Sequence, residues 1–203
     1  MFGTNAAPQF TIRRGVAATK APANPIPAVR FTFKGVQVDI TSIQSAPSRD
    51  AFLDGLRRQI DIVDEISIDP ARKAFLKSVP IVIEASNGSD HYSSETRSVV
   101  LYLQPSYDPG KPIVLHELLH AYHDQKLASG YANAEIRNLY QQARSSGQFP
   151  ANSYMLKNSV EYFAMMASVY LYGSAARDPF TRQAIKEKQP DCYLWLAKEF
   201  GPK

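Results

Sequence analysis

Alternating hydrophobic and polar positions predict a small sheet in the first half of the chain. Residues Arg30 to Ile40 (RFTFKGVQVDI) alternate between the two classes, with Lys34-Gly35 as a candidate turn. Residues Pro80 to Glu84 (PIVIE) and Arg97 to Gln104 (RSVVLYLQ) have the composition of two further strands, and the polar connection between them contains Asn87-Gly88. We therefore expect these last two strands to pair as a hairpin.

Helical spacing takes over in the remaining segments. Between Ser48 and Ile66 the apolar residues recur at helical intervals, and Ser48 is a candidate cap. Asp69-Pro70 predicts the start of another short helix, and every segment after Pro112 is helical in pattern. These patterns predict an α+β fold, in which a small N-terminal sheet with helices is followed by a helical C-terminal half.

Composition indicates one domain preceded by a lead. The chain has 203 residues, 44% of them hydrophobic, which suffices for one well-buried domain. Residues Met1 to Val29 are rich in Ala and Pro and lack apolar periodicity, so we expect an extended or disordered lead, with the domain formed by residues Arg30 to Lys203. The single cysteine, Cys192, excludes an intramolecular disulfide and a multi-cysteine zinc site.

Charge and hydropathy exclude two classes of partner. The net charge of +4 is mild, and the basic residues form no stripe interleaved with stacking aromatics, so nucleic-acid binding is not indicated. No run of about 18 apolar residues exists, so no transmembrane segment is expected. The start lacks the apolar core of a signal peptide. Because the Ala/Pro-rich lead resembles linkers that follow export signals, we expect a periplasmic or secreted protein whose signal was removed before numbering, with a cytoplasmic protein as the alternative.

The stretch His116-Glu117-Leu118-Leu119-His120 matches H-E-x-x-H, the pattern that zinc-dependent peptidases carry on a helix. At ~100° per residue, positions i and i+4 lie on one face of a helix, so the imidazoles of His116 and His120 can reach one metal ion. Glu117 projects beside them, where a carboxylate can serve as base for a metal-activated water. The residues therefore predict a zinc hydrolase.

The surrounding sequence supplies the helix that this pattern needs. Pro112 suits a first turn, and Gly130 stands where a C-terminal glycine would close the segment. The alternative is a buried amphipathic helix whose histidines are core residues. Three of the four histidines fall between His116 and His123, which favours the metal site.

His123 is not expected to be a ligand. It lies ~10 Å along the helix axis from His116, at ~1.5 Å per residue, and three-histidine peptidases break the helix with a glycine before their third ligand. We interpret His123 and Asp124 as residues that support the ligands or face solvent. Asp124, four positions after His120, could hydrogen-bond an imidazole and fix its tautomer.

The third ligand is expected to be a carboxylate from another helix, and two glutamates compete. Glu135 belongs to a segment with ordinary amphipathic spacing and charged neighbours, which is typical of a solvated face. Glu161 stands in a helix of apolar and small residues with almost no other charge. A lone carboxylate in such a helix needs a partner, so we favour Glu161.

The sequence HELLHAYHD, followed about forty residues later by VEYFAMMASVYLYG, resembles the gluzincin peptidases grouped around the catalytic domain of anthrax lethal factor. This group includes the Mlc titration factor peptidases and the Pro-Pro endopeptidases, and the resemblance covers about Leu101 to Phe200. It implies a zincin-like metalloprotease domain. By this similarity His116, His120 and Glu161 match the zinc ligands and Glu117 matches the catalytic base.

The resemblance also singles out Tyr154. The related enzymes carry a tyrosine seven residues before the glutamate ligand, where it donates to the developing oxyanion, and Tyr154 stands seven residues before Glu161. The residues allow this role, because Gln148 to Tyr154 form a loop from which a phenol can enter a cleft. The alternative is a loop aromatic that covers the core. His123 departs from the acidic residue commonly found at its position.

These observations predict a zinc-dependent peptidase that binds one Zn²⁺ per chain and acts on a peptide or protein substrate. Among peptidases, we expect an endopeptidase. Zinc would activate water, Glu117 would take its proton, and Tyr154 would stabilise the oxyanion. The alternative is a binding or regulatory module on the zincin fold, although such a module has no chemical need for Glu117 or Tyr154. A structural zinc domain is a third interpretation, but structural sites are usually closed by four protein ligands and this chain offers three.

The strand predicted at Arg97 to Gln104 has a further expected role. A strand immediately before the zinc helix commonly forms the upper rim of a zincin cleft, where an extended substrate can pair with its free edge. The alternative is that this strand is internal to the sheet.

Overall fold

The computed structural model of the chain describes residues 27–105, 107–108 and 110–203. Within these residues the strands are β1 (Arg30–Phe33), β2 (Val36–Asp39), β3 (Ile81–Glu84), β4 (His91–Ser93) and β5 (Ser98–Tyr102). The α-helices are α1 (Arg49–Glu65), α2 (Pro70–Ser78), α3 (Ile113–Lys126), α4 (Ala134–Ser146), α5 (Ser159–Tyr172), α6 (Arg182–Lys188) and α7 (Pro190–Phe200). Three short 3₁₀ turns complete the described elements: η1 (Thr41–Ile43), η2 (Gly130–Ala132) and η3 (Tyr154–Leu156).

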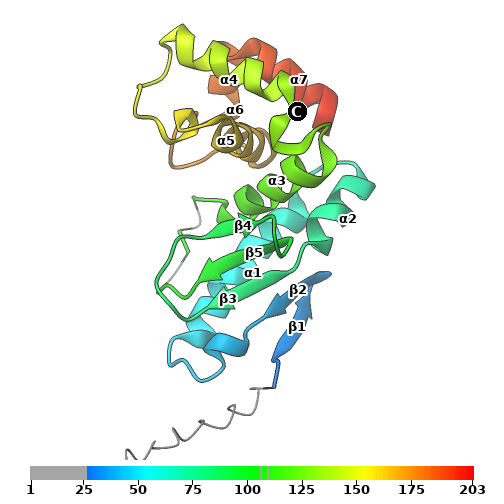
Figure 1. The fold of residues 1–203 in the computed structure, drawn as a ribbon, viewed down its shortest axis with the longest axis vertical. Coiled ribbons are helices and arrows are strands. Elements are labelled where there is room, and N and C mark those ends of the chain that lie inside the picture. Colours follow the sequence, from blue (N-terminus) through cyan, green and yellow to red (C-terminus); the bar gives the residue numbers. More distant parts are fainter. Residues whose placement is uncertain (1–26, 106, 109) are drawn as a thin grey trace, which may run out of the picture.

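Figure 1 shows these elements in two halves, with the sheet, α1 and α2 in one and α4 to α7 in the other. Helix α3 lies between the halves, and it packs against α1 and α2 as well as against α5. The predicted α+β architecture, with a small sheet first and a helical half second, is confirmed. Since α3 carries the H-E-x-x-H pattern, the pattern lies where the two halves meet.

The first two strands form the hairpin that the alternation predicts. β1 pairs antiparallel with β2, and Phe33 lies opposite Val36. Between them Lys34 has φ 47° and Gly35 has φ 86°. Two consecutive residues with positive φ are the backbone of a type I′ turn, whose twist matches that of the flanking strands. The prediction of a turn at these two residues is confirmed.

The expected hairpin between Pro80–Glu84 and Arg97–Gln104 is wrong. β3 and β5 are parallel neighbours, with Val82 opposite Val100, in a sheet of order β1-β2-β3-β5-β4. The polar connection between them contains the short strand β4, which passes to the far side of β5 and pairs with it antiparallel. Short apolar runs specify a strand but not its partner, so the sequence did not distinguish a hairpin from this crossover.

The prediction that the strand at Arg97 to Gln104 forms the free rim of the cleft is wrong. β5 lies between β3 and β4 and is therefore internal, as the alternative interpretation held. β4 is the edge strand at this end of the sheet. Its three residues, with His91 exposed and Tyr92 buried, are too few to produce a recognisable alternation.

Two helix starts agree with the sequence patterns. The Asp69 side chain accepts hydrogen bonds from the backbone N–H groups of Ala71 and Arg72, which caps α2 at the predicted place. Ser48 stands at the N-cap of α1, but its side chain makes no capping hydrogen bond. The end of α3 differs from the expectation, because the helix stops at Lys126 and Gly130 instead begins the turn η2.

Helix α5 is buried over nearly its whole length, from Tyr162 to Leu171. A helix that is hydrophobic on all sides belongs in the core, and α5 packs mainly against α3. Asn158 caps its first turn by accepting from the backbone N–H groups of Val160, at 2.9 Å, and of Glu161, at 2.8 Å. The cap fixes the orientation of the turn that carries Glu161.

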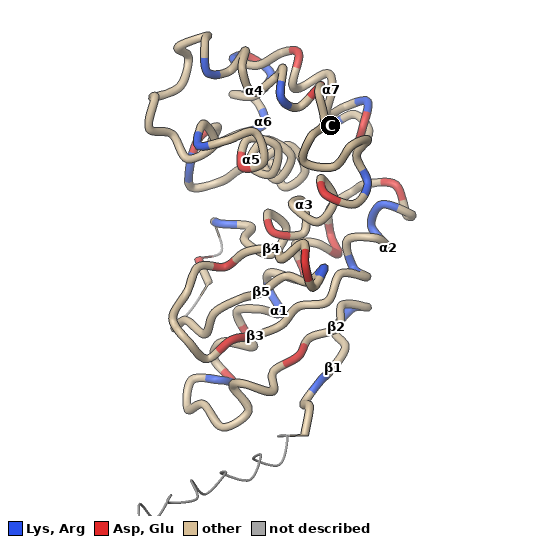
Figure 2. The backbone as a smooth tube through the Cα atoms, in the orientation of Figure 1, with Lys and Arg blue, Asp and Glu red and all other residues tan. Residues whose placement is uncertain are grey.

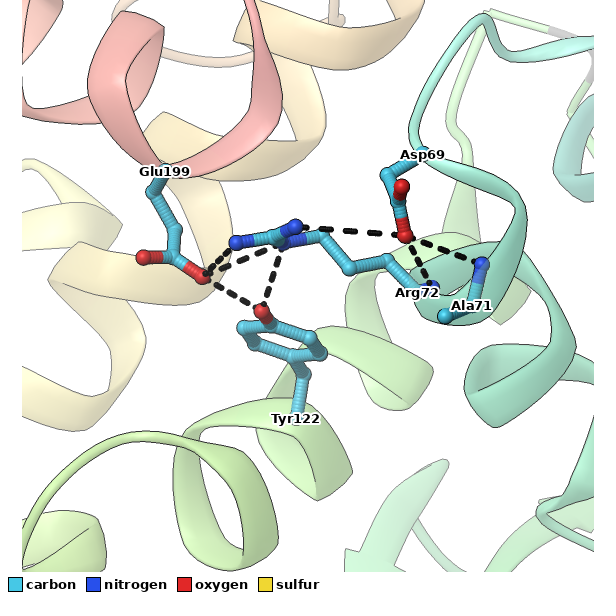
Figure 3. A network of polar contacts seen from close by, with 5 residues as sticks. All are labelled: Asp69, Ala71, Arg72, Tyr122 and Glu199. Carbon is cyan, nitrogen blue, oxygen red and sulfur yellow. Dashed lines mark hydrogen bonds and ion pairs between the residues drawn. The ribbon is translucent and has the colours of Figure 1, made fainter.

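A polar network ties three helices together away from the H-E-x-x-H turns (Figure 3). Arg72 of α2 donates from Nε to the Tyr122 hydroxyl of α3 at 3.0 Å, and its Nη2 lies 3.3 Å from Glu199 Oε1 of α7. The Tyr122 hydroxyl donates in turn to Glu199. Residues from both halves are thus joined through α3.

The predicted lead, Met1 to Val29, lies outside the described residues except for its last three. Val29 belongs to the folded part, since its backbone N–H donates to Thr41 Oγ1 at 2.9 Å. Across the described ranges, none of the helices has the length and apolarity needed to cross a membrane. Export stays a prediction.

Candidate active site

Three side chains from α3 and α5 converge on one point. The Nε2 atoms of His116 and His120 lie 3.1 Å apart, and Glu161 Oε2 lies 3.2 Å from the first and 3.4 Å from the second. In a tetrahedral zinc site with bonds of ~2.05 Å, adjacent donors are about 3.3 Å apart. The donor set therefore fits zinc in both chemistry and spacing.

The local structure explains the convergence. His116 and His120 stand one turn apart on α3, so their rings project from the same face. Glu161 lies in the first turn of α5, where a carboxylate is also favoured by the helix dipole. Lys157 Nζ lies 4.0 Å from Glu161 Oε1, at the outer side of the cluster.

The protonation states suit metal binding. Burial lowers the pKa of His116, which keeps its imidazole neutral and outweighs the hydrogen bond to Glu161. Burial alone would raise the pKa of Glu161, but the hydrogen bonds from His116 and His120 outweigh it and hold the pKa well below its usual range. A neutral imidazole and an ionised carboxylate are the forms that coordinate a metal ion.

Glu117 faces the same cleft and is 7% exposed. Its pKa is raised well above the usual value, first by burial and then by the negative charges of Glu161 and Asp90, against a smaller opposing effect of the Tyr92 backbone N–H. A carboxylate in this environment takes up a proton more readily than a surface glutamate. The geometry and the electrostatics both suit a base.

Tyr154 lies in the turn η3, inside the loop from which the sequence analysis expects it to reach a cleft. Its ring centroid is 6.4 Å from that of His116. Burial and the Glu161 charge raise its pKa, so the phenol keeps its proton and can donate it in a hydrogen bond. The side chain is 37% exposed, which leaves it accessible from the cleft.

The cleft has a volume of about 540 Å³. His116, Glu117 and Tyr154 line it together with two loop segments, Ser86 to Asp90 and Ala175 to Arg177, which we call its two walls. The loop of the first wall packs closely against the sheet, since a Cβ at Gly88 would lie 2.2 Å from the ring of Tyr102. Two segments distant in the sequence therefore enclose the donors.

The competing glutamate lies elsewhere. Glu135 is at the start of α4, and its Oε2 accepts a hydrogen bond from Trp195 Nε1 at 3.0 Å. The group of possible metal donors that the described residues bring together contains Glu161 and not Glu135. The role of Glu161 as a ligand stays a prediction, now with a geometry that supports it.

His123 and Asp124 differ from their expected roles. His123 is not solvated but completely buried, with its ring centroid 4.8 Å from that of Phe163 and 5.2 Å from that of Tyr131. Neither ring nitrogen has a hydrogen-bond partner among the described residues, and burial lowers the pKa to about 4. Asp124 does not bind an imidazole, because its Oδ2 accepts from the Tyr92 hydroxyl at 3.0 Å.

The sequence analysis missed the second wall of the cleft. Arg177 lines it, with its guanidinium 5.1 Å from the centroid of the Tyr154 ring. Asp178 accepts a hydrogen bond from Ser153 Oγ at 3.1 Å, which joins this wall to the loop of Tyr154. A loop residue after a helix carries no periodic signal, so only the Gly173 that ends α5 marked the change of direction.

Charged residues of both signs occur throughout the described part of the chain. Figure 2 shows Lys and Arg interspersed with Asp and Glu along the backbone of both halves.

Comparison with known proteins supports the resemblance. No protein-family model matches the chain. Over 87 residues the chain is 33% identical to a Pro-Pro endopeptidase from Paenibacillus alvei, and the match covers 43% of this chain and 37% of that relative. The chain thus spans little more than a third of the length of the relative.

A solved structure of a Pro-Pro endopeptidase from Paenibacillus alvei has the same fold. Its TM-score is 0.52 at 23% sequence identity, and the match covers 74% of this chain and 90% of that chain. The two comparisons confirm the similarity to the Pro-Pro endopeptidase group and the zincin-like α+β fold that it implies.

Proposed function

We propose that this protein is a zinc-dependent endopeptidase. The observation that carries the proposal is the convergence of His116 Nε2, His120 Nε2 and Glu161 Oε2 within 3.4 Å of one another beside a cleft that Glu117 also lines. The sequence similarity to a Pro-Pro endopeptidase supports the same reaction class.

In this proposal His116, His120 and Glu161 hold one zinc ion, and three protein donors leave a coordination position open, as catalytic zinc sites do. When bound, zinc supplies a Lewis acid that polarises the scissile carbonyl and makes a water molecule acidic. Glu117 removes the proton from the attacking water and passes it to the leaving amine. The phenol of Tyr154 donates a hydrogen bond to the oxygen on which negative charge develops.

The edge strand β4 offers a binding surface for the peptide. The sheet ends at β4, and the loop that leads into it, Ser86 to Asp90, lines the cleft. An extended peptide can add to a free strand edge through backbone hydrogen bonds, which hold it without regard to side chains. We propose that the substrate lies along β4 with its scissile bond beside Glu117.

The substrate to test first follows from the relative. The protein from Paenibacillus alvei is named a Pro-Pro endopeptidase. We extend this to the present chain as a proposal: the bond between two consecutive prolines is the first candidate. A peptide library with a Pro-Pro centre and a matched library with a random centre separate this preference from general endopeptidase activity.

The decisive experiment is cleavage-site profiling of both libraries with the zinc-loaded wild type and with Glu117→Gln. The substitution keeps the shape of the side chain and leaves the three donors alone, so zinc content should persist while hydrolysis falls by about 10²–10⁴. Equal turnover by both proteins would show either that the activity is a contaminant or that Glu117 is not the base. If neither protein cleaves any peptide and both bind them, the binding module considered from the sequence is the correct interpretation.

A further inference from the structure

Arg177 is a cation in the wall of the cleft that no carboxylate neutralises within the described residues. Two other charged residues that line the cleft, Lys111 and Asp90, have polar partners. Lys111 Nζ lies 3.3 Å from Asp108 Oδ2. Asp90 accepts from the Tyr102 backbone N–H at 2.9 Å and from Gln104 Nε2 at 3.2 Å.

The ring of Tyr154 carries the Arg177 guanidinium on its face. The separation is 5.1 Å, within the range of cation–π attraction. A guanidinium stacked on a ring still presents its N–H groups at its edge, where they match the two oxygens of a carboxylate. Lys157 approaches the same ring at 5.6 Å, but its ammonium also lies 4.0 Å from Glu161. Among the described residues that line the cleft, Arg177 is therefore the cation that remains available to a ligand.

The loop around Arg177 is held in place on both sides. The Arg177 carbonyl accepts from the Phe180 backbone N–H at 2.7 Å, and Ala175 N–H donates to the Phe180 carbonyl at 2.8 Å. Ser174 and Thr181, which flank this segment, form an isolated β-bridge. A fixed backbone lowers the entropic cost of holding a charged side chain at one point of a binding site.

We propose that Arg177 is a specificity-determining residue that binds a carboxylate of the substrate. The inference rests on the proposed peptidase function. Two sources of the carboxylate have the same chemistry: an Asp or Glu side chain close to the scissile bond, or the C-terminal carboxylate of a short peptide. Because the Tyr154 ring lies 5.1 Å from the Arg177 guanidinium and 6.4 Å from the His116 ring, the carboxylate binds within reach of the reacting bond.

The test uses one cleavable peptide in which Glu, Gln or Lys is placed in turn at each position around the cleaved bond. Each peptide is made with a free C-terminal carboxylate and with a C-terminal amide. The proteins are the wild type, Arg177→Gln, Arg177→Glu and the control Arg144→Gln. Arg144 is matched because it is also exposed and stacked on a tyrosine, 5.7 Å from the Tyr140 ring, but it does not line the cleft.

For the wild type and the control, kcat/KM should favour one carboxylate by about five- to twentyfold over its neutral counterpart, less at high salt. Preference for Glu over Gln at one position identifies the side-chain source, and preference for acid over amide identifies the C-terminus. Arg177→Gln should reduce the preference to below about twofold, and Arg177→Glu should shift it towards Lys.

Two results would overturn the inference. One is a wild type that cleaves charged and neutral peptides equally well. The other is an Arg177→Gln protein whose kcat falls equally for every peptide, since Arg177 would then only position Tyr154. If the wild type cleaves nothing, the proposed function has failed. Calorimetric titration of the same peptides into Glu117→Gln then tests the carboxylate preference separately, and equal affinities for Glu and Gln peptides would reject it.

Discussion

The first turns of α3 and its last turn place similar residue types in opposite environments. His116 lines the cleft, and its Nε2 lies 3.1 Å from His120 Nε2 and 3.2 Å from Glu161 Oε2. His123, one turn further, is wrapped by aromatic rings and has no hydrogen-bond partner among the described residues. The imidazole itself is the same in both places. Helix α5 brings a carboxylate, Glu161, to the first two histidines and a phenyl ring, Phe163, to the third, and we infer that this difference decides which of them can serve as the proposed ligands.

The largest expected effect comes from removing one of the three proposed zinc ligands. His116→Ala, His120→Ala and Glu161→Ala should each lower zinc affinity by more than about 100-fold and abolish peptidase activity, because a three-donor site has no replacement ligand. Metal analysis at limiting zinc measures the loss. Glu135→Ala is the matched control, since Glu135 is also on a helix but bonds to Trp195. Stoichiometric zinc in Glu161→Ala together with loss in Glu135→Ala would exchange the roles of the two glutamates.

A second test concerns the phenol next to this cluster. Tyr154→Phe removes one hydroxyl that is proposed to act in the transition state, so kcat should fall by ~10²–10³ with little change in KM or zinc content. Steady-state kinetics on a substrate with rate-limiting chemistry separates the two constants. A loss smaller than about threefold would return Tyr154 to a packing role.

A third test concerns His123, the buried histidine in the last turn of α3. His123 has a folded-state pKa of about 4 against an ordinary value of 6.5. As the pH falls below ~6.5, His123 binds a proton in the unfolded chain but not in the folded protein. The wild type therefore loses stability between pH 6.5 and 4. At pH 4.5 the loss from this group should approach about 2 kcal/mol.

His123→Phe should remove that part of the acid sensitivity, because phenylalanine fills an aromatic pocket without titrating. Urea unfolding at pH 7 and pH 4.5 measures it, with His91→Phe at an exposed histidine as the control. Zinc content and activity should stay close to those of the wild type. Loss of zinc from His123→Phe would mean that the two ends of α3 are not functionally separate.

The smallest effect is expected from the polar network of Arg72, Tyr122 and Glu199, and it concerns stability. Tyr122→Phe removes the hydroxyl that joins Arg72 to Glu199, and the free energy of unfolding should fall by about 1 kcal/mol. A double-mutant cycle with Arg72→Gln, followed by urea unfolding, measures the coupling. Additive effects would show that the three side chains do not act as a unit. Activity at saturating zinc should be unchanged.

The elements that follow local rules could be predicted from the sequence. The Lys34-Gly35 turn, the cap at Asp69 and the helical spacing between Ser48 and Ile66 all depend on neighbours a few residues away. The pairing of β3 with β5 does not, because it depends on where a connecting segment passes in space. The end of α3 was also misplaced, since the glycine that should have closed it belongs to the next turn.

For the candidate site the same distinction holds. The spacing of His116 and His120 is a local property of a helix, and the lone carboxylate in an apolar segment pointed to Glu161. Arg177 had no such signal, because it is an exposed arginine in a loop. It reaches the cleft only because the segment after α5 packs against the loop of Tyr154. Burial of His123 was missed because the rings that cover it come from later segments.

The two walls of the cleft have a consequence for how such a protein diversifies. The proposed donors and base are carried by helices α3 and α5, while the walls are the connections Ser86 to Asp90 and Ala175 to Arg177. Loops tolerate insertion and exchange far better than packed helices do. Descendants of one ancestral scaffold can therefore acquire new targets by altering either connection, and a protein engineer can graft such a connection to redirect cleavage without redesigning the chemistry.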